Sequence, residues 1–87
     1  MGSYSIEWKS SAVGELKKLD KVVFRKVLKS VESLSAKLRP AGVRKLVGAE
    51  NTYRIRCGDY RIVYSIQDRK LVVEIIRVGH RSNIYKI

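Results

Sequence analysis

A cluster of arginines on a predicted hairpin is the part of this sequence best suited to chemistry. Residues 53–64 read Tyr-Arg-Ile-Arg-Cys-Gly-Asp-Tyr-Arg-Ile-Val-Tyr. Glycine in the first position of a two-residue loop is typical of a type II′ hairpin, so Gly58 and Asp59 are predicted to form the turn. Counting outward from this turn places Arg56 directly opposite Arg61 on the neighbouring strand.

Three arginines, Arg54, Arg56 and Arg61, share one face of this hairpin because side chains alternate along a strand. Like charges opposite each other destabilise a sheet, whereas the planar arginine fork holds phosphate in a bidentate manner. The pattern therefore favours a binding site for a polyanion, most simply phosphate. A basic face that contacts only solvent is the alternative. Because the cations repel one another, we expect Arg61→Ala to leave the fold intact.

Several motifs of catalytic sites are missing from this sequence, and their absence excludes some reaction types. The sequence contains no glycine-rich phosphate loop, no paired-carboxylate motif and no Ser/His/Asp spacing. Acidic residues are scarce in the second half, which argues against a two-metal nuclease site, so no metal and no cofactor are expected. Arginines with a histidine and tyrosines suit metal-free cleavage of RNA, in which the nucleophile is the 2′-hydroxyl of the substrate.

Charge and composition indicate the kind of partner. The chain has 87 residues, which predicts a single domain over residues 1–87, and its formal net charge is +11. A field of this strength attracts nucleic acid, an anionic membrane or an acidic protein. One cysteine excludes an internal disulfide, and no apolar run approaches a membrane span. We expect a cytoplasmic protein that does not associate with membranes.

The elements that position the arginines are predicted from apolar periodicity. Helical spacing of apolar residues predicts a short helix capped by Ser10 or Ser11 and a longer helix capped by Asp20. Pro40 ends the second helix, because proline cannot continue one. Strands are predicted at residues 4–8, 43–47, 53–57, 60–66 and 71–78.

The last strand is predicted to pair with the hairpin through a turn at Asp68 and Arg69. Placing Ile66 opposite Leu71 puts Glu74 on the arginine face, where it is a counter-ion or, alternatively, a catalytic group. The predicted order is β-α-α-β-β-β. This order indicates an α+β fold, in which an antiparallel sheet carries a helical hairpin on one face and leaves the opposite face open.

Three segments of the sequence together resemble the RelE family of toxins from toxin–antitoxin systems. The resemblance covers essentially the whole chain and implies a bacterial or archaeal endoribonuclease that cleaves mRNA in the ribosomal A site. It also implies a cognate acidic antitoxin, bound in a heterodimer or heterotetramer. The segments are Arg44-Lys45-Leu46-Val47-Gly48, the hairpin at residues 53–64, and Val78-Gly79-His80-Arg81 with Tyr85.

The resemblance also implies which residues act on RNA. The best-known ribosome-dependent members have lysines at two of the family's basic catalytic positions, whereas this chain has arginines, which cannot exchange a proton near neutral pH. The general base is therefore Tyr85 or His80, and the sequence leaves both open. The expected catalytic residues are Arg54, Arg56, Arg61, Arg81, Tyr85 and His80, and the expected RNA-binding residues are Arg44, Lys45, Arg54, Arg56 and Arg77.

Two other functions are compatible with the composition. A toxin of the related ParE kind shares the fold and poisons DNA gyrase without cutting RNA. A plain RNA-binding or operator-binding module would explain the charge but not the Gly-His-Arg segment followed by Tyr85. The complete basic set with a terminal tyrosine favours the ribonuclease.

Overall fold

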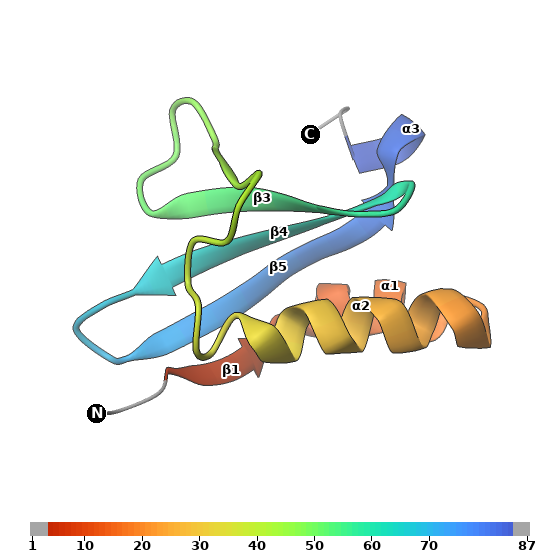
Figure 1. Ribbon diagram of the computed structural model, residues 1–87, viewed down its shortest axis with the longest axis horizontal. Helices are drawn as coiled ribbons and strands as arrows, with labels where there is room; N and C mark the ends of the chain where they lie inside the picture. Colours follow the sequence, from red (N-terminus) through yellow and green to blue (C-terminus); the bar gives the residue numbers. More distant parts are fainter. Residues whose placement is uncertain (1–3, 85–87) are drawn as a thin grey trace.

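A five-stranded sheet with two helices on one face makes up most of the computed structural model, which describes residues 4–84 (Figure 1). The strand order is β1-β5-β4-β3-β2. None of the helices in this part of the chain is long and apolar enough to cross a bilayer. The elements are β1 (Ser5–Trp8), α1 (Ser10–Lys17), α2 (Lys21–Ser33), β2 (Arg44–Lys45), β3 (Thr52–Cys57), β4 (Tyr60–Gln67), β5 (Val72–His80) and α3 (Arg81–Ile84).

The α+β class and the β-α-α-β-β-β order predicted from the sequence are confirmed, with the short helix α3 following β5. One pairing differs from the all-antiparallel sheet that we expected. Strand β1 pairs with β5 in parallel, with Ser5 beside Val72 and Trp8 beside Ile75. Tight turns impose antiparallel pairing only on strands that they join directly. Because β1 and β5 are far apart in the chain, no local signal determines their relative direction.

The longer helix begins as the sequence predicts. The side chain of Asp20 caps α2 by accepting a hydrogen bond from the backbone N–H of Val23, at 3.0 Å. The predicted serine cap of α1 is wrong, because Lys9 occupies the N-cap position and makes no side-chain cap. The second helix ends at Ser33, before Pro40, which was predicted to end it.

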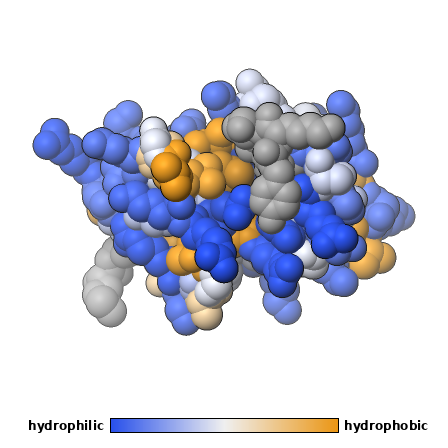
Figure 2. All heavy atoms as spheres, turned by 90° about the horizontal axis from the view of Figure 1, so that it is seen from above, coloured by the Kyte–Doolittle hydropathy of each residue, from blue (hydrophilic) through white to orange (hydrophobic). Residues whose placement is uncertain are grey.

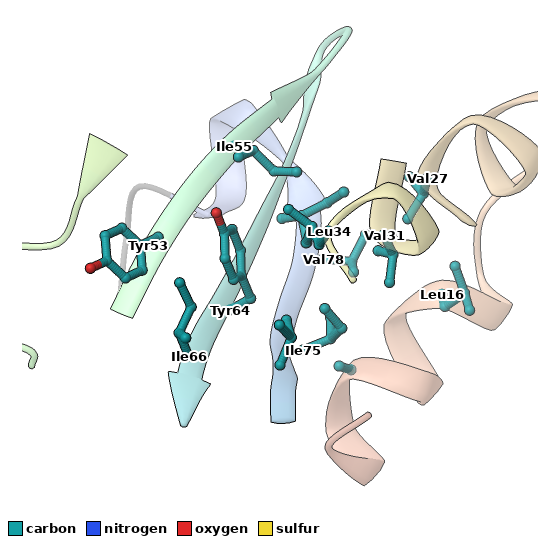
Figure 3. Packing of buried hydrophobic residues seen from close by; sticks show 13 residues of the cluster. Leu16, Val27, Val31, Leu34, Tyr53, Ile55, Tyr64, Ile66, Ile75 and Val78 are labelled. Carbon is teal, nitrogen blue, oxygen red and sulfur yellow. The ribbon is translucent and has the colours of Figure 1, made fainter. Parts of the chain in front are cut away.

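The hydrophobic core lies between α1, α2 and the adjacent face of the sheet (Figure 3). Burial of this apolar surface is the main force that fixes the helices against the strands. The core residues are Ala12, Leu16, Val27, Val31, Leu34, Tyr53, Ile55, Ile62, Tyr64, Ile66, Val73, Ile75 and Val78.

The hairpin that carries the arginines has the register predicted from its turn. Arg56 pairs with Arg61, and Arg54 pairs with Val63. Gly58 has φ +61°, the left-handed conformation that the first position of a type II′ turn requires. Local turn chemistry was therefore sufficient to place the arginines on one face.

The register between β4 and β5 differs from the prediction. Ile66 pairs with Val73 instead of Leu71, because residues 68–71 form a longer turn in which Leu71 has φ +55° and is 51% exposed. A shift by two residues preserves the alternation of faces, so Val73 still enters the core. Glu74 now lies opposite Ser65 and not beside Val63, so its predicted place as a counter-ion in the arginine row is wrong.

Candidate functional site

A cleft with a volume of about 630 Å³ lies beside β3, between this edge of the sheet and the C-terminal part of α2. Of the described residues that line it, none is acidic and four are arginines. We call this feature the cationic cleft. Its lining residues are Ser30, Ser33, Pro40, Ala41, Gly42, Arg44, Arg54, Ile55, Arg56 and Arg61.

The pairing of the strands brings the four arginines of the cationic cleft together. Arg44 lies opposite Arg54 across β2 and β3, and Arg56 lies opposite Arg61 across β3 and β4. Arg44 and Arg56 are exposed, whereas Arg54 is half-buried. Figure 2 looks onto the face of the sheet away from α1 and α2, and this view is dominated by hydrophilic side chains. The arrangement offers several guanidinium groups to one anionic ligand.

Arg61 is held more firmly than a solvent-facing cation would be. Its side chain is only 5% exposed, and its Nη1 donates hydrogen bonds to the carbonyl oxygens of Gly58 at 3.1 Å and Tyr60 at 3.0 Å. The guanidinium therefore supports the hairpin turn while it lines the cationic cleft. This geometry changes our expectation that Arg61→Ala leaves the fold intact, because the substitution removes two hydrogen bonds from a buried group.

Arg81 is attached to the same hairpin turn through its backbone. The N–H of Arg81 donates to the carbonyl oxygen of Asp59 at 2.8 Å, so α3 begins beside the turn (Figure 1). Its side chain is exposed. The turn thus organises two of the predicted site residues, Arg61 through its side chain and Arg81 through its main chain.

His80 belongs to the opposite face of the sheet from the arginines of the hairpin. It pairs with Tyr60, and the two rings meet edge to face with centroids 5.4 Å apart. Its Nδ1 accepts a hydrogen bond from the backbone N–H of Ser82 at 3.2 Å, which directs the ring toward α3. Tyr60 alternates with Arg61 along β4, so His80 shares the Tyr60 side. Tyr85, the other predicted base, lies outside the described residues.

The remaining predicted RNA-binding residues are divided by the structure. Arg77 forms an ion pair with Glu15 of α1, with Nη2 and Oε2 2.9 Å apart, and it does not line the cationic cleft. Lys45 lies in β2 next to Arg44 but lines a second, shallower hollow with residues 46–50. Of this predicted group, the cationic cleft therefore includes Arg44 and not Lys45 or Arg77.

Two buried tyrosines, Tyr53 and Tyr64, anchor the chain that leads into one wall of the cationic cleft. The hydroxyl of Tyr64 donates to the carbonyl oxygen of Leu38 at 2.7 Å, and Arg39 Nε donates to the hydroxyl of Tyr53 at 3.2 Å. Burial raises the pKa of Tyr64 to about 12. These contacts fix residues 38–39, which immediately precede the wall formed by residues 40–42.

The wall of the cationic cleft that faces the arginines was not predicted from the sequence. Ser30 and Ser33 contribute from α2, and residues 40–42 contribute from the following loop. The two serines are three positions apart and therefore lie on one side of the helix. This spacing could have shown from the sequence that the two serines share one side of the helix. It could not show that this side faces the cleft, because that depends on how the helix packs beside β3. Within residues 4–84 the structure contains no group of three or more His, Cys, Asp or Glu residues placed to hold a metal ion.

Comparisons with known proteins identify the class to which this fold and cleft belong. Residues 6–85 match the family model described as the ParE toxin of the type II toxin–antitoxin system, parDE. The chain belongs to the RelE/ParE superfamily of toxins from type II toxin–antitoxin systems.

The similar proteins include several of the RelE kind. The mRNA interferase toxin RelE of Escherichia coli K12 is 35% identical over 88 residues, which cover 95% of this chain and 90% of the relative. The archaeal RelE–RelB complex from Pyrococcus horikoshii OT3 contains a chain with a TM-score of 0.81 and 29% identity, covering 93% of this chain and 98% of that one. The isolated E. coli RelE toxin has a TM-score of 0.80 and 31% identity, with 97% and 93% coverage.

Proposed function

We propose that this toxin is an endoribonuclease that cleaves mRNA. The observation that carries the proposal is the cationic cleft, where four arginines and no described acidic residue line one cavity. Such a cavity attracts the negative charge of an RNA backbone and repels cations. The E. coli relative named an mRNA interferase toxin supports the same activity.

In the proposed mechanism, Arg54, Arg56 and Arg61 hold the phosphate to be cleaved. The 2′-hydroxyl oxygen of the preceding ribose forms a bond to phosphorus, and the bond from phosphorus to the 5′-oxygen breaks. The 2′-hydroxyl proton passes to a general base, and the departing 5′-oxygen receives a proton from an acid. The products are a 2′,3′-cyclic phosphate and a 5′-hydroxyl.

The guanidinium groups supply the electrostatic part of this reaction. Negative charge increases on the phosphate oxygens as the new bond forms, and donors fixed in advance stabilise it. Arginine cannot itself accept the proton near neutral pH. Because His80 faces the Tyr60 side of the sheet, we assign the general base to Tyr85. We also place Arg81 in this site, since α3 begins at the same hairpin turn that Arg61 supports.

We further propose that the toxin acts in the cytoplasm on mRNA in the ribosomal A site and is neutralised by an acidic antitoxin. The net charge of +11 supports an acidic partner. The similar structures from P. horikoshii and E. coli include complexes of RelE with RelB. By analogy, we expect a heterodimer or heterotetramer here.

The test of this function is to incubate the purified toxin with a defined mRNA, with and without translating ribosomes, and to analyse the ends of the fragments. We expect 2′,3′-cyclic or 3′-phosphate ends and 5′-hydroxyl ends, and no cleavage where the nucleotide before the cut carries a 2′-deoxyribose. In a ribosome-free reaction, excess EDTA should leave the rate unchanged. Fragments with 5′-phosphates would contradict the mechanism.

A second function, inhibition of DNA gyrase, is favoured by the match to the ParE family model. A toxin of that kind would block supercoiling of a relaxed plasmid by gyrase and leave mRNA intact. The same preparation should be tested in both assays, because the two functions predict opposite results. We expect mRNA cleavage without inhibition of supercoiling.

A further inference from the structure

The cationic cleft has two walls of different chemistry. One wall carries the arginines of β2, β3 and β4, and the other is formed by α2 and the loop at residues 40–42. The second wall is uncharged and includes Ser30, Ser33, Pro40 and Ala41. Phosphate contacts require only the arginine wall, so the uncharged wall suits a different part of a ligand.

We propose that the uncharged wall binds one nucleobase of the RNA next to the phosphate that the arginines hold. This inference rests on the proposed function and adds which part of the substrate contacts α2. A volume of about 630 Å³ lies within the usual range for sites that enclose small organic groups, so the cleft has room for a base in addition to a phosphate.

The edge of β3 gives an RNA strand access to this wall. On the side of β3 away from β4, β2 pairs only with Tyr53 and Arg54, so within the described chain no strand lies on that side of residues 55–57. An RNA backbone on the arginine face can therefore turn its base over this edge toward α2. The exposed guanidinium of Arg44, which the proposed mechanism does not assign to the phosphate, is available to stack on the base, a contact that is common in the recognition of single-stranded RNA.

The hydrogen bonds of the two serines define what the wall would recognise. Ser33 Oγ donates its proton to the carbonyl oxygen of Ser30 at 2.7 Å, and Ser30 Oγ donates to Cys57 Sγ at 3.5 Å. With both protons directed into the protein, the two hydroxyl oxygens are left as acceptors. Acceptors favour a base that offers an exocyclic amino group, which adenine, cytosine and guanine have and uracil lacks.

The experiment compares cut sites in cells that express the wild type, Ser33→Ala, Ala41→Phe and the control Ala36→Phe. Ala41 and Ala36 are both exposed, but only Ala41 lines the cationic cleft, so the control adds the same bulk outside it. We expect the wild type to disfavour uracil at one position adjacent to the cut. Ser33→Ala and Ala41→Phe should weaken that preference by roughly fivefold or more, and Ala36→Phe should retain it.

If Ala41→Phe abolishes cleavage, its cut sites cannot be compared, and a binding measurement tests the proposal instead. Short RNAs with a 2′-deoxyribose at the cut site bind without being cut, and removing one base at a time shows which base contributes. In the wild type, loss of the base next to the cut should weaken binding roughly tenfold. In Ala41→Phe the complete and abasic RNAs should bind equally, because phenylalanine occupies the base site.

The possible failures are distinguishable. A wild type that cleaves no RNA would contradict the proposed function itself. A wild type that cleaves with the same base preference as Ser33→Ala and Ala41→Phe, or that binds every abasic RNA normally, would overturn only the base site. Unchanged cut sites combined with loss of neutralisation by the antitoxin in Ala41→Phe would also overturn it and assign the wall to the protein partner.

Discussion

Arg56 and Arg61 face each other across the hairpin, yet the structure gives them different roles. Arg56 is exposed, whereas Arg61 is almost fully buried and donates to two carbonyl oxygens of the turn. Removing a buried donor such as Arg61 leaves its acceptor carbonyls without that hydrogen bond. Removing an exposed cation such as Arg56 exposes the neighbouring groups to water, which can hydrogen-bond to them. The two residues therefore allow the binding of phosphate to be separated from the stability of the fold.

We expect Arg56→Ala to lower the cleavage rate by about 10²–10³, the usual effect of removing a fixed donor, while the free energy of unfolding changes by less than about 0.5 kcal/mol. Arg61→Ala should lower the rate and also reduce the free energy of unfolding by about 1–3 kcal/mol. Single-turnover cleavage and urea unfolding measure the two quantities. Lys29→Ala, on the exposed side of α2, is the control that should change neither. Full activity of Arg56→Ala would remove the arginine face from the site.

The position of His80 leads to a second prediction at the scale of single residues. Because His80 lies on the Tyr60 side of the sheet, His80→Gln should change the cleavage rate by less than about threefold, within the range of a residue that does not transfer the proton. Tyr85→Phe should lower the rate by about 10²–10⁴, since it removes the hydroxyl of the proposed base. Rates at several pH values would compare the two variants. A large loss in His80→Gln with little loss in Tyr85→Phe would reverse the assignment.

At the scale of elements, the carboxylate of Glu15 links α1 to β5 by hydrogen bonds and an ion pair. Glu15 Oε1 accepts a hydrogen bond from the backbone N–H of Val78 at 2.8 Å, and Oε2 accepts from Arg77 Nη2 at 2.9 Å. Strand β1 pairs with β5 only as far as Ile75, so Glu15 occupies the edge that follows. This contact explains why Arg77 does not reach the cationic cleft.

Glu15→Ala should therefore reduce the free energy of unfolding by about 1–3 kcal/mol, the range for hydrogen bonds to a charged group, because it leaves the N–H of Val78 and the guanidinium of Arg77 without this partner. Urea unfolding is the measurement. Glu32→Ala is the matched control, since Glu32 is exposed on α2 and its side chain makes no hydrogen bond described in residues 4–84. Equal effects of the two substitutions would show that the contact with β5 contributes little.

At the scale of the whole molecule, Tyr64 connects the centre of the sheet to the chain that follows α2. Its ring is fully buried, its hydroxyl donates to Leu38, and burial raises its pKa to about 12 from the usual 10. The neutral hydroxyl is therefore favoured in the folded state. Its contribution to stability is complete below pH 10 and is lost as the pH rises from about 10 to 12.

This linkage predicts that the wild type loses stability in that alkaline range more steeply than Tyr64→Phe does. At neutral pH, Tyr64→Phe should cost about 1–2 kcal/mol, because the carbonyl oxygen of Leu38 loses its donor. The difference between the two proteins should shrink above pH 10 and disappear before pH 12. Thermal unfolding from pH 7 to pH 12 would show it. A constant difference across this range would mean that Tyr64 does not titrate with a raised pKa.

Features that depend on neighbouring residues could be predicted from the amino-acid sequence. Gly58 and Asp59 specified a two-residue turn, and that turn set the register that places Arg54, Arg56 and Arg61 on one face. Asp20 marked the start of α2 in the same way. The combined resemblance of three segments, residues 44–48, 53–64 and 78–81 with Tyr85, to the RelE family of toxins also indicated the superfamily. Turn geometry, alternation and capping act over a few residues, so each can be read from the chain directly.

Features that depend on packing between distant segments became visible only in the folded structure. The parallel pairing of β1 with β5, the longer turn before β5 and the contact between Glu15 and Arg77 join residues that no local signal connects. The cationic cleft exists because core packing brings Ser30 and Ser33 beside the edge of β3. Many alternative pairings of these segments would bury similar amounts of apolar surface. The close packing of the whole core selects one of them, and the pattern of apolar residues along the chain does not specify that packing.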